Sequence, residues 1–155
     1  MIRSPGAPAL PSFLRVVKLL REPLVVVMRA DHTLAARRGR LPMALLADQP
    51  FVFYGTSMGL TLPSQVLALC QSAGFEPRIA QIGGANATIL ALVAVGMGIA
   101  IIPEAMSRLN HPAVVTRPIA DPSATTSVWV VRRHDDHSRL TQVFVELMIP
   151  EEATS

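Results

Sequence analysis

The sequence from residue 79 to residue 103, IAQIGGANATILALVAVGMGIAIIP, contains no charged side chain. A helix that spans a membrane needs about 20 predominantly apolar residues without a break. In this stretch, turn-forming residues interrupt the apolar run at Gly83, Gly84, Asn86, Gly96, Gly98 and Pro103. The stretch is therefore predicted to form three short elements of a folded core and not a membrane span.

These interruptions predict a strand, a helix and a second strand. Residues 78–82 are expected to form a buried strand, and Asn86 is expected to cap the next helix, 87–95, by accepting a backbone N–H. Gly96 follows this helix and is the residue type that adopts a left-handed C-cap without a Cβ penalty. The second strand is predicted at residues 99–102.

The same order of elements precedes this stretch. A strand at 51–54 leads through the loop GTSMGLT, residues 55–61, into a helix at 62–73, and an aliphatic strand at 24–28 comes earlier. One face of the helix carries Leu62, Val66, Leu69, Cys70 and Ala73. Strands that alternate with helices through short connections predict a parallel sheet covered by helices, which is the α/β class.

The two ends of the chain follow a different pattern. Residues 1–22 are rich in proline and glycine at their start and are expected to contain little regular structure. A strand is predicted at 127–132 and an amphipathic helix at 138–149. The apolar face of that helix contains Leu140, Val143, Phe144, Leu147 and Met148. Because such a face needs a partner, it is expected to drive self-association.

Composition excludes several classes of protein. Half of the 155 residues are apolar and 16% are charged, so intrinsic disorder is not expected. The 14 basic residues are scattered and are not interleaved with aromatic residues, which disfavours direct nucleic-acid binding by this chain. Cys70 is the only cysteine, so no internal disulfide can form. The first 30 residues do not have the form of a secretory signal, which favours a cytoplasmic location.

A ligand site is predicted where the first two βα loops leave their strands, because ligands of open α/β sheets bind outside the carboxyl ends of strands. The loop 55–61 offers the hydroxyls of Thr56, Ser57 and Thr61, and it is flanked by apolar Met58 and Leu62. A helix N-terminus just beyond it carries partial positive charge. These groups suit a small anion with an apolar body. Serine, threonine and glycine are also ordinary loop residues, and Thr61 alternatively caps the helix.

GTSMG matches the GxSxG pattern of serine hydrolases, and Asp121 and His134 or His137 follow Ser57 in the hydrolase order. In that motif the helix begins at the serine, so that the next N–H helps to bind the oxyanion. Here residues 59–62 separate Ser57 from Pro63, a residue type that prefers the first turn of a helix. Catalysis by Ser57 is therefore a disfavoured alternative.

Two further motifs carry no cofactor prediction. HDDH, residues 134–137, lacks the separated ligands of a zinc site and is expected to be a solvated turn. GMGIAI, residues 96–101, lacks the third glycine of GxGxxG and precedes a strand, whereas a dinucleotide fingerprint follows one. We therefore expect neither a metal nor a nucleotide cofactor.

Five segments in fixed order carry a family resemblance: REPLVVVMRADHTLA (21–35), LADQPFVFYGTSMG (46–59), AGFEPRIAQ (73–81), ATILALVAVGMGIAIIPEAM (87–106) and VVTRPIADP (114–122). Together they resemble the effector-binding domain of LysR-type transcriptional regulators. The ordered set covers nearly the whole chain.

The resemblance implies a fold like that of type II periplasmic binding proteins, with two α/β lobes and an effector in the cleft between them. Residues 1–23 would be a remnant of the first lobe, 24–116 a complete second lobe, 117–150 the return to the first lobe, and 151–155 a tail. The first lobe would thus be partial. The family's N-terminal helix-turn-helix and linker helix have no counterpart in the sequence, so DNA binding is expected only through those missing parts. Effector binding by this chain is expected to be weak or undetectable.

The resemblance also implies that residues 55–62 form the effector loop of the second lobe. Thr56, Ser57 and Thr61 would be polar contacts, with Met58 and Leu62 as apolar ones. Asn86 and Arg3 are further candidates. The implied protein is not an enzyme, needs no cofactor, and forms a dimer or tetramer when whole. A solute-binding protein of the same fold is the other alternative, disfavoured because no secretory signal is evident.

Overall fold

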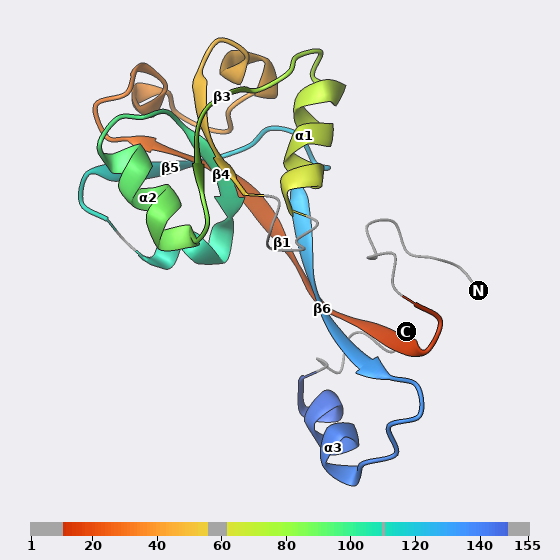
Figure 1. Ribbon diagram of the computed structural model, residues 1–155. Coiled ribbons are helices and arrows are strands. Elements are labelled where there is room, and N and C mark those ends of the chain that lie inside the picture. Colours follow the sequence, from red (N-terminus) through yellow and green to blue (C-terminus); the bar gives the residue numbers. More distant parts are fainter. Residues whose placement is uncertain (1–10, 56–61, 110, 149–155) are drawn as a thin grey trace. The chain divides into compact units, whose positions relative to one another are not determined.

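A computed structural model describes residues 11–55, 62–109 and 111–148 (Figure 1). The chain divides into two compact units, Glu22–Thr126 and the pair of segments Met1–Arg21 and Ser127–Ser155. The elements in chain order are β1 (Leu14–Arg29), η1 (Thr33–Ala36), η2 (Met43–Leu46), β2 (Pro50–Tyr54), α1 (Leu62–Ser72), β3 (Arg78–Gly83), α2 (Asn86–Ala94), β4 (Ala100–Pro103), η4 (Glu104–Leu109), β5 (Val114–Pro118), β6 (Thr125–Arg133) and α3 (Arg139–Met148). The α/β class is confirmed. Nowhere among these residues is there a helix with the length and apolar character that a membrane span requires.

The sheets are mixed, which corrects the expectation of a parallel sheet. β2 and β3 are parallel, as predicted, but β1 lies between β4 and β5 and is antiparallel to both. Parallel neighbours need a long crossover connection, usually a helix. The strand–helix alternation that predicts such crossovers runs only from β2 to β4, so it says nothing about the partners of β1.

Ile99 joins the two sheets of the larger unit. It forms a parallel bridge with Phe51, in which Val52 N–H donates to Ile99 O and Ile99 N–H donates to Pro50 O, each at 2.8 Å. The start of β4 therefore lies beside β2 and runs in the same direction. The strands follow one another in space as β3, β2, β4, β1 and β5.

Gly98 makes this junction possible. Its φ is 153°, and a Cβ atom at this position would lie 2.3 Å from Pro50 O. No real side chain tolerates that distance, because the obstructing atom belongs to the backbone of a paired strand. Gly98 thus has a larger role than the helix-to-strand turn that the sequence indicates.

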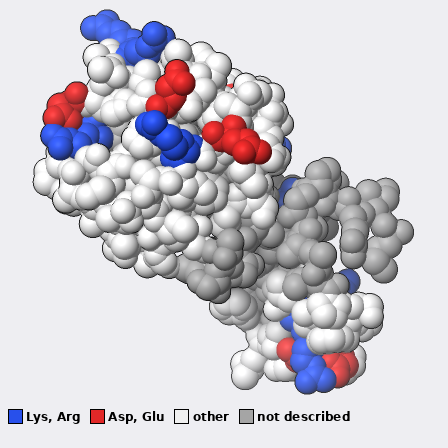
Figure 2. Space-filling model, turned by 45° about the horizontal axis from the view of Figure 1, so that its top comes forward, with Lys and Arg blue, Asp and Glu red and all other residues white. Residues whose placement is uncertain are grey.

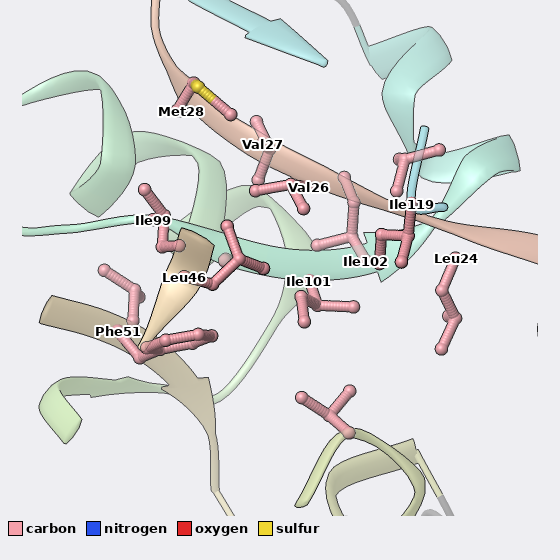
Figure 3. Packing of buried hydrophobic residues seen from close by; sticks show 14 of the residues in the cluster. Leu24, Val26, Val27, Met28, Leu46, Phe51, Ile99, Ile101, Ile102 and Ile119 are labelled. Carbon is pink, nitrogen blue, oxygen red and sulfur yellow. The ribbon is translucent and has the colours of Figure 1, made fainter. Parts of the chain in front are cut away.

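The core of the larger unit surrounds β1 and β4 (Figure 3). The residues from Leu24 to Met28 are all buried, as predicted for a strand covered on both faces. Figure 3 shows the side chains of Leu24, Val26, Val27 and Met28 in one cluster with Leu46, Phe51 and the isoleucines of β4. Each large aliphatic side chain buried in this way stabilises the fold by roughly 1.5–3 kcal/mol.

The two α-helices of this unit follow the sequence predictions closely. α1 buries Leu62, Val66, Leu69 and Cys70, the predicted apolar face, and Gly74 follows it with a φ of 84°. α2 is followed by Gly96, whose φ is 85°. Both glycines therefore adopt the left-handed conformation that ends a helix.

β3 is exposed, so the prediction that residues 78–82 are buried is wrong. Only Gly83 is buried in this strand, while Ile79 and Ile82 are 48% and 63% exposed. Among the described strands β3 pairs with β2 alone and lies at the edge of the sheet. Isoleucine favours the strand conformation, so these residues form a strand although no other element buries them among the described residues.

The smaller unit contains regular structure at both ends of the chain. Little regular structure is predicted for residues 1–22, but β1 begins at Leu14, so this prediction is wrong from Leu14 onward. The strand forms there because it pairs with β6. The strand and helix predicted after residue 126 are present as β6 and α3. Val145 is the one buried residue of α3, while Leu140 and Leu147 are 84% and 80% exposed.

Replacing Gly98 with alanine should destabilise the chain strongly. The Cβ clash with Pro50 O and the positive φ together should lower the free energy of unfolding by about 2–4 kcal/mol. Gly39→Ala is the matched control, because Gly39 also has a positive φ, 82°, but no atom lies within 4 Å of the added Cβ. Urea unfolding should therefore show a larger loss for Gly98→Ala than for Gly39→Ala, and equal losses would contradict the role of Gly98.

The exposed face of α3 should make the chain associate with itself. Leu140→Gln with Phe144→Gln removes two large exposed side chains from this face, so association should weaken. Light scattering over a concentration series measures the change. Leu67→Gln on α1, where the replaced leucine is 38% exposed, is the control. A wild-type chain that stays monomeric at high concentration would refute this prediction.

Candidate ligand site at the ends of strands β2 and β3

The carboxyl ends of β2 and β3 lie side by side. Tyr54 and Gly83 are register partners, and Gly55 N–H donates to Gly83 O at 3.1 Å. The loops that follow the two strands therefore start next to each other, as the sequence predicts.

Most of the predicted contact residues cannot be placed. Thr56, Ser57, Met58, Thr61 and Arg3 lie outside the described residues, so their part in a site stays a prediction. The structure does place Leu62 and Asn86. Leu62 begins α1 and is 8% exposed, so most of its side chain belongs to the core.

Asn86 does not cap α2, and this prediction is wrong. The N-cap residue is Ala85, which makes no side-chain capping bond, and Asn86 is the first residue of the helix. Its Oδ1 accepts a hydrogen bond from the Tyr54 hydroxyl at 2.8 Å. Its Nδ2 donates to Met106 Sδ at 3.1 Å. Asn86 thus lies one position inside the helix, and its Oδ1 pairs with Tyr54 instead.

Tyr54 is a site residue that the sequence reasoning missed. It is 5% exposed, and burial raises its pKa to about 12. The hydroxyl thus remains protonated and able to donate at neutral pH. One sequence feature could have indicated it, since Tyr54 is the only tyrosine of the chain and stands at the carboxyl end of a predicted strand.

No side chain among the described residues caps the N-terminus of α2. Ala85 has no side-chain oxygen, and the first turn of the helix contains no acidic residue. The first backbone N–H groups of a helix have no partner within it, and they carry partial positive charge. Together with the half-buried Asn86, they form a donor-rich edge suited to a carboxylate or a similar anion.

The described residues give no support to a catalytic triad or a metal site. Asp121 accepts hydrogen bonds from the backbone N–H and the hydroxyl of Ser123, which lower its pKa. His134 lies in an exposed turn, the solvated turn predicted for HDDH, and its backbone N–H donates to Phe13 O. Within the described ranges no three histidine, cysteine or acidic side chains could hold a metal ion.

A hollow of about 240 Å³ lies elsewhere in the larger unit, lined by Val27, Leu90, Ser107, His111, Val114, Val115, Thr116 and Arg117. Two of its polar side chains already have partners. The Arg117 guanidinium donates to the carbonyls of Ala35, Arg37 and Thr116, and the Ser107 hydroxyl donates to Glu104 O. This hollow therefore offers few groups that could recognise a polar ligand.

Charges of both signs occur on the side of the molecule seen in Figure 2. Several basic side chains lie beside acidic ones there, and one basic area at the top of the view stands apart. Arg29 and Asp31 form one such pair, with a side-chain distance of 2.5 Å. Exposed pairs of this kind contribute little to stability.

Known proteins match nearly the whole chain. Residues 2–152 match the family described as LysR substrate binding domain. The HTH-type transcriptional regulator YnfL of Escherichia coli K12, itself uncharacterised, is 32% identical over 137 residues, which are 88% of this chain and 46% of that protein. The chain thus spans about half the length of the curated relatives that it matches.

Solved structures agree with this match. The C-terminal domain of a probable LysR family transcriptional regulator from Rhodococcus sp. RHA1 superposes with a TM-score of 0.74 and 27% identity, over 91% of this chain and 70% of that one. The effector binding domain of QuiR in complex with shikimate has a TM-score of 0.79 at 20% identity, over 93% and 68%. The chain therefore belongs to the LysR substrate-binding domain family.

Proposed function

We propose that this chain is the effector-sensing part of a LysR-type transcriptional regulator. Family membership and the likeness to an effector-binding domain solved with shikimate support this function. The larger unit, Glu22–Thr126, would be the second lobe, and the smaller unit would belong to the first. This unit contains residues 24–116, the second lobe that the family resemblance implies, and its core also includes Ile119 and Ala124.

The effector would bind at the adjacent ends of β2 and β3. The observation that carries this proposal is the Gly55–Gly83 hydrogen bond, which brings one loop and the open N-terminus of α2 to the same place. The effector would be a small molecule with a carboxylate. Thr56, Ser57 and Thr61 would add polar contacts, Met58 and Leu62 apolar ones, and Arg3 a further charge.

Regulation would follow from differential binding. An effector shifts a conformational equilibrium only if it binds one conformation more tightly than the other. A nearly complete shift needs a difference in binding free energy of about 5 kcal/mol between the two conformations. In the whole regulator, DNA binding would belong to an N-terminal helix-turn-helix, and the protein would act as a homo-oligomer in the cytoplasm. No catalytic step is part of this function.

An NMR titration tests the site. Acetate, succinate and benzoate, added at millimolar concentration to the 15N-labelled chain, should shift the amide signals of Gly55 and of residues 83–88. Shifts confined to residues that line the hollow of about 240 Å³, such as Leu90 and Thr116, would overturn the proposed site. The serine hydrolase alternative predicts instead that the chain hydrolyses esters and that Ser57→Ala abolishes this activity.

A charged cap at Ala85 should compete with the effector. Ala85 has the extended conformation of a capping residue, so aspartate or asparagine there should stabilise α2 by about 1 kcal/mol. Aspartate also places a negative charge where the carboxylate would bind. In the same titration, Ala85→Asp should therefore weaken carboxylate binding by at least tenfold, while Ala85→Asn should weaken it less. Equal affinities for the two variants would contradict an anion site at this helix end.

A further inference from the structure

The side-chain amide of Asn86 lies between two groups of opposite hydrogen-bonding character. Met106 Sδ is 3.1 Å from its Nδ2, and the Tyr54 hydroxyl is 2.8 Å from its Oδ1. A thioether sulfur has no proton and can only accept, so the nitrogen must be the atom that faces Met106. The amide oxygen therefore faces Tyr54.

This arrangement fixes the direction of the second hydrogen bond. An amide oxygen can only accept, so the Tyr54 hydroxyl must donate to it. Tyr54 is buried at the end of β2, and its burial keeps the hydroxyl protonated. Asn86 Oδ1 accepts one hydrogen bond, from Tyr54, whereas Nδ2 has two protons and only Met106 as a partner among the described residues, so one N–H is left to donate.

We propose that Tyr54 is a positioning residue that holds the Asn86 amide in one orientation, so that the site offers an N–H donor to the effector and not an oxygen acceptor. The inference rests on the proposed function and makes it more specific. The group of the effector that meets Asn86 must itself be an acceptor, such as a carboxylate or carbonyl oxygen. A ligand with an amine or another donor at this place would face Nδ2 and be rejected.

The contributing residues come from three strand ends. Tyr54 ends β2, Asn86 follows β3 after a short turn, and Met106 lies in η4, directly after β4. The exposed fraction of Asn86 is intermediate, so this residue is not sealed in the core. Selectivity for an acceptor would thus arise from the positions of three strands and not from the effector loop alone.

Titration of Tyr54 gives a check that needs no ligand. Because Tyr54 is the only tyrosine, the absorbance of tyrosinate reports this residue alone. Burial raises its pKa to about 12 in the folded chain, whereas an unfolded chain should titrate near pH 10. The stability contributed by this difference is complete below pH 10 and is lost as the pH rises towards 12. Ionisation near pH 10 in the folded chain would show an exposed hydroxyl and contradict the inference.

The main test compares Tyr54→Phe with wild type in two backgrounds, Asn86 and Asn86→Ala. Acetate, succinate and benzoate are titrated beside their primary amides, which replace an acceptor oxygen with a donor. In the Asn86 background, Tyr54→Phe should weaken carboxylate binding roughly tenfold and reduce the preference for acid over amide. In the Asn86→Ala background the same change should have little effect. Equal weakening in both backgrounds would overturn the inference and leave the proposed site standing.

A second readout separates this inference from the proposed function. The Asn86 side-chain NH2 signals of the 15N-labelled chain should move towards those of a solvated amide in Tyr54→Phe, and less so in Met106→Leu, which keeps the volume of the side chain but removes the sulfur. If none of the carboxylates binds the wild type, the proposed function fails for these ligands, while the positioning of Asn86 is still judged by these signals. Signals that do not change in Tyr54→Phe would overturn it.

Discussion

The hydrogen bond from Gly55 N–H to Gly83 O is the interaction on which the candidate site depends. It continues the parallel register of β2 and β3 by one residue beyond Tyr54, so both strands stop at the same level. Parallel pairing aligns carboxyl ends, whereas an antiparallel pair would place the two loops at opposite ends of the sheet. The two loops that follow these strands are neighbours only because of that alignment.

A second constraint brings β4 to the same edge. The close approach of Gly98 to Pro50 lets Ile99 pair with Phe51, and η4 then leaves β4 near the end of β2. Met106 reaches Asn86 for this reason. Gly98 thus determines the surroundings of the Asn86 amide, because it decides how close two strands can come.

The sequence predicts local structure well and strand partners poorly. Helical periodicity from Leu62 to Ala73 and the glycines at 74 and 96 fix where the helices lie and end, since these depend on neighbouring residues. The antiparallel partners of β1 depend on contacts between distant segments, which periodicity does not encode. The exposure of β3 could not be predicted for the same reason. An apolar strand has the same sequence pattern at the edge of a sheet as in its middle.

At the candidate site, too, the sequence predicts local features well and contacts between distant residues poorly. Its position at two neighbouring strand ends follows from the order of elements, but the hydrogen bond between Tyr54 and Asn86 joins residues 32 apart in the chain. A capping role for Asn86 follows from its expected place before a helix, whereas the helix begins at Asn86 itself and its Oδ1 accepts from Tyr54, a distant partner. Local rules tend to fail where a distant side chain competes for the same atom.

The most direct test of the adjacent strand ends is the scalar coupling across the hydrogen bond between the Gly55 amide nitrogen and the Gly83 carbonyl carbon. A deuterated chain labelled with 15N and 13C should show this coupling, together with slowed exchange of the Gly55 amide proton. A Gly55 amide that exchanges freely with solvent, or that couples to a different carbonyl, would mean that the two loops do not start together. The proposed effector site would then lose its structural basis.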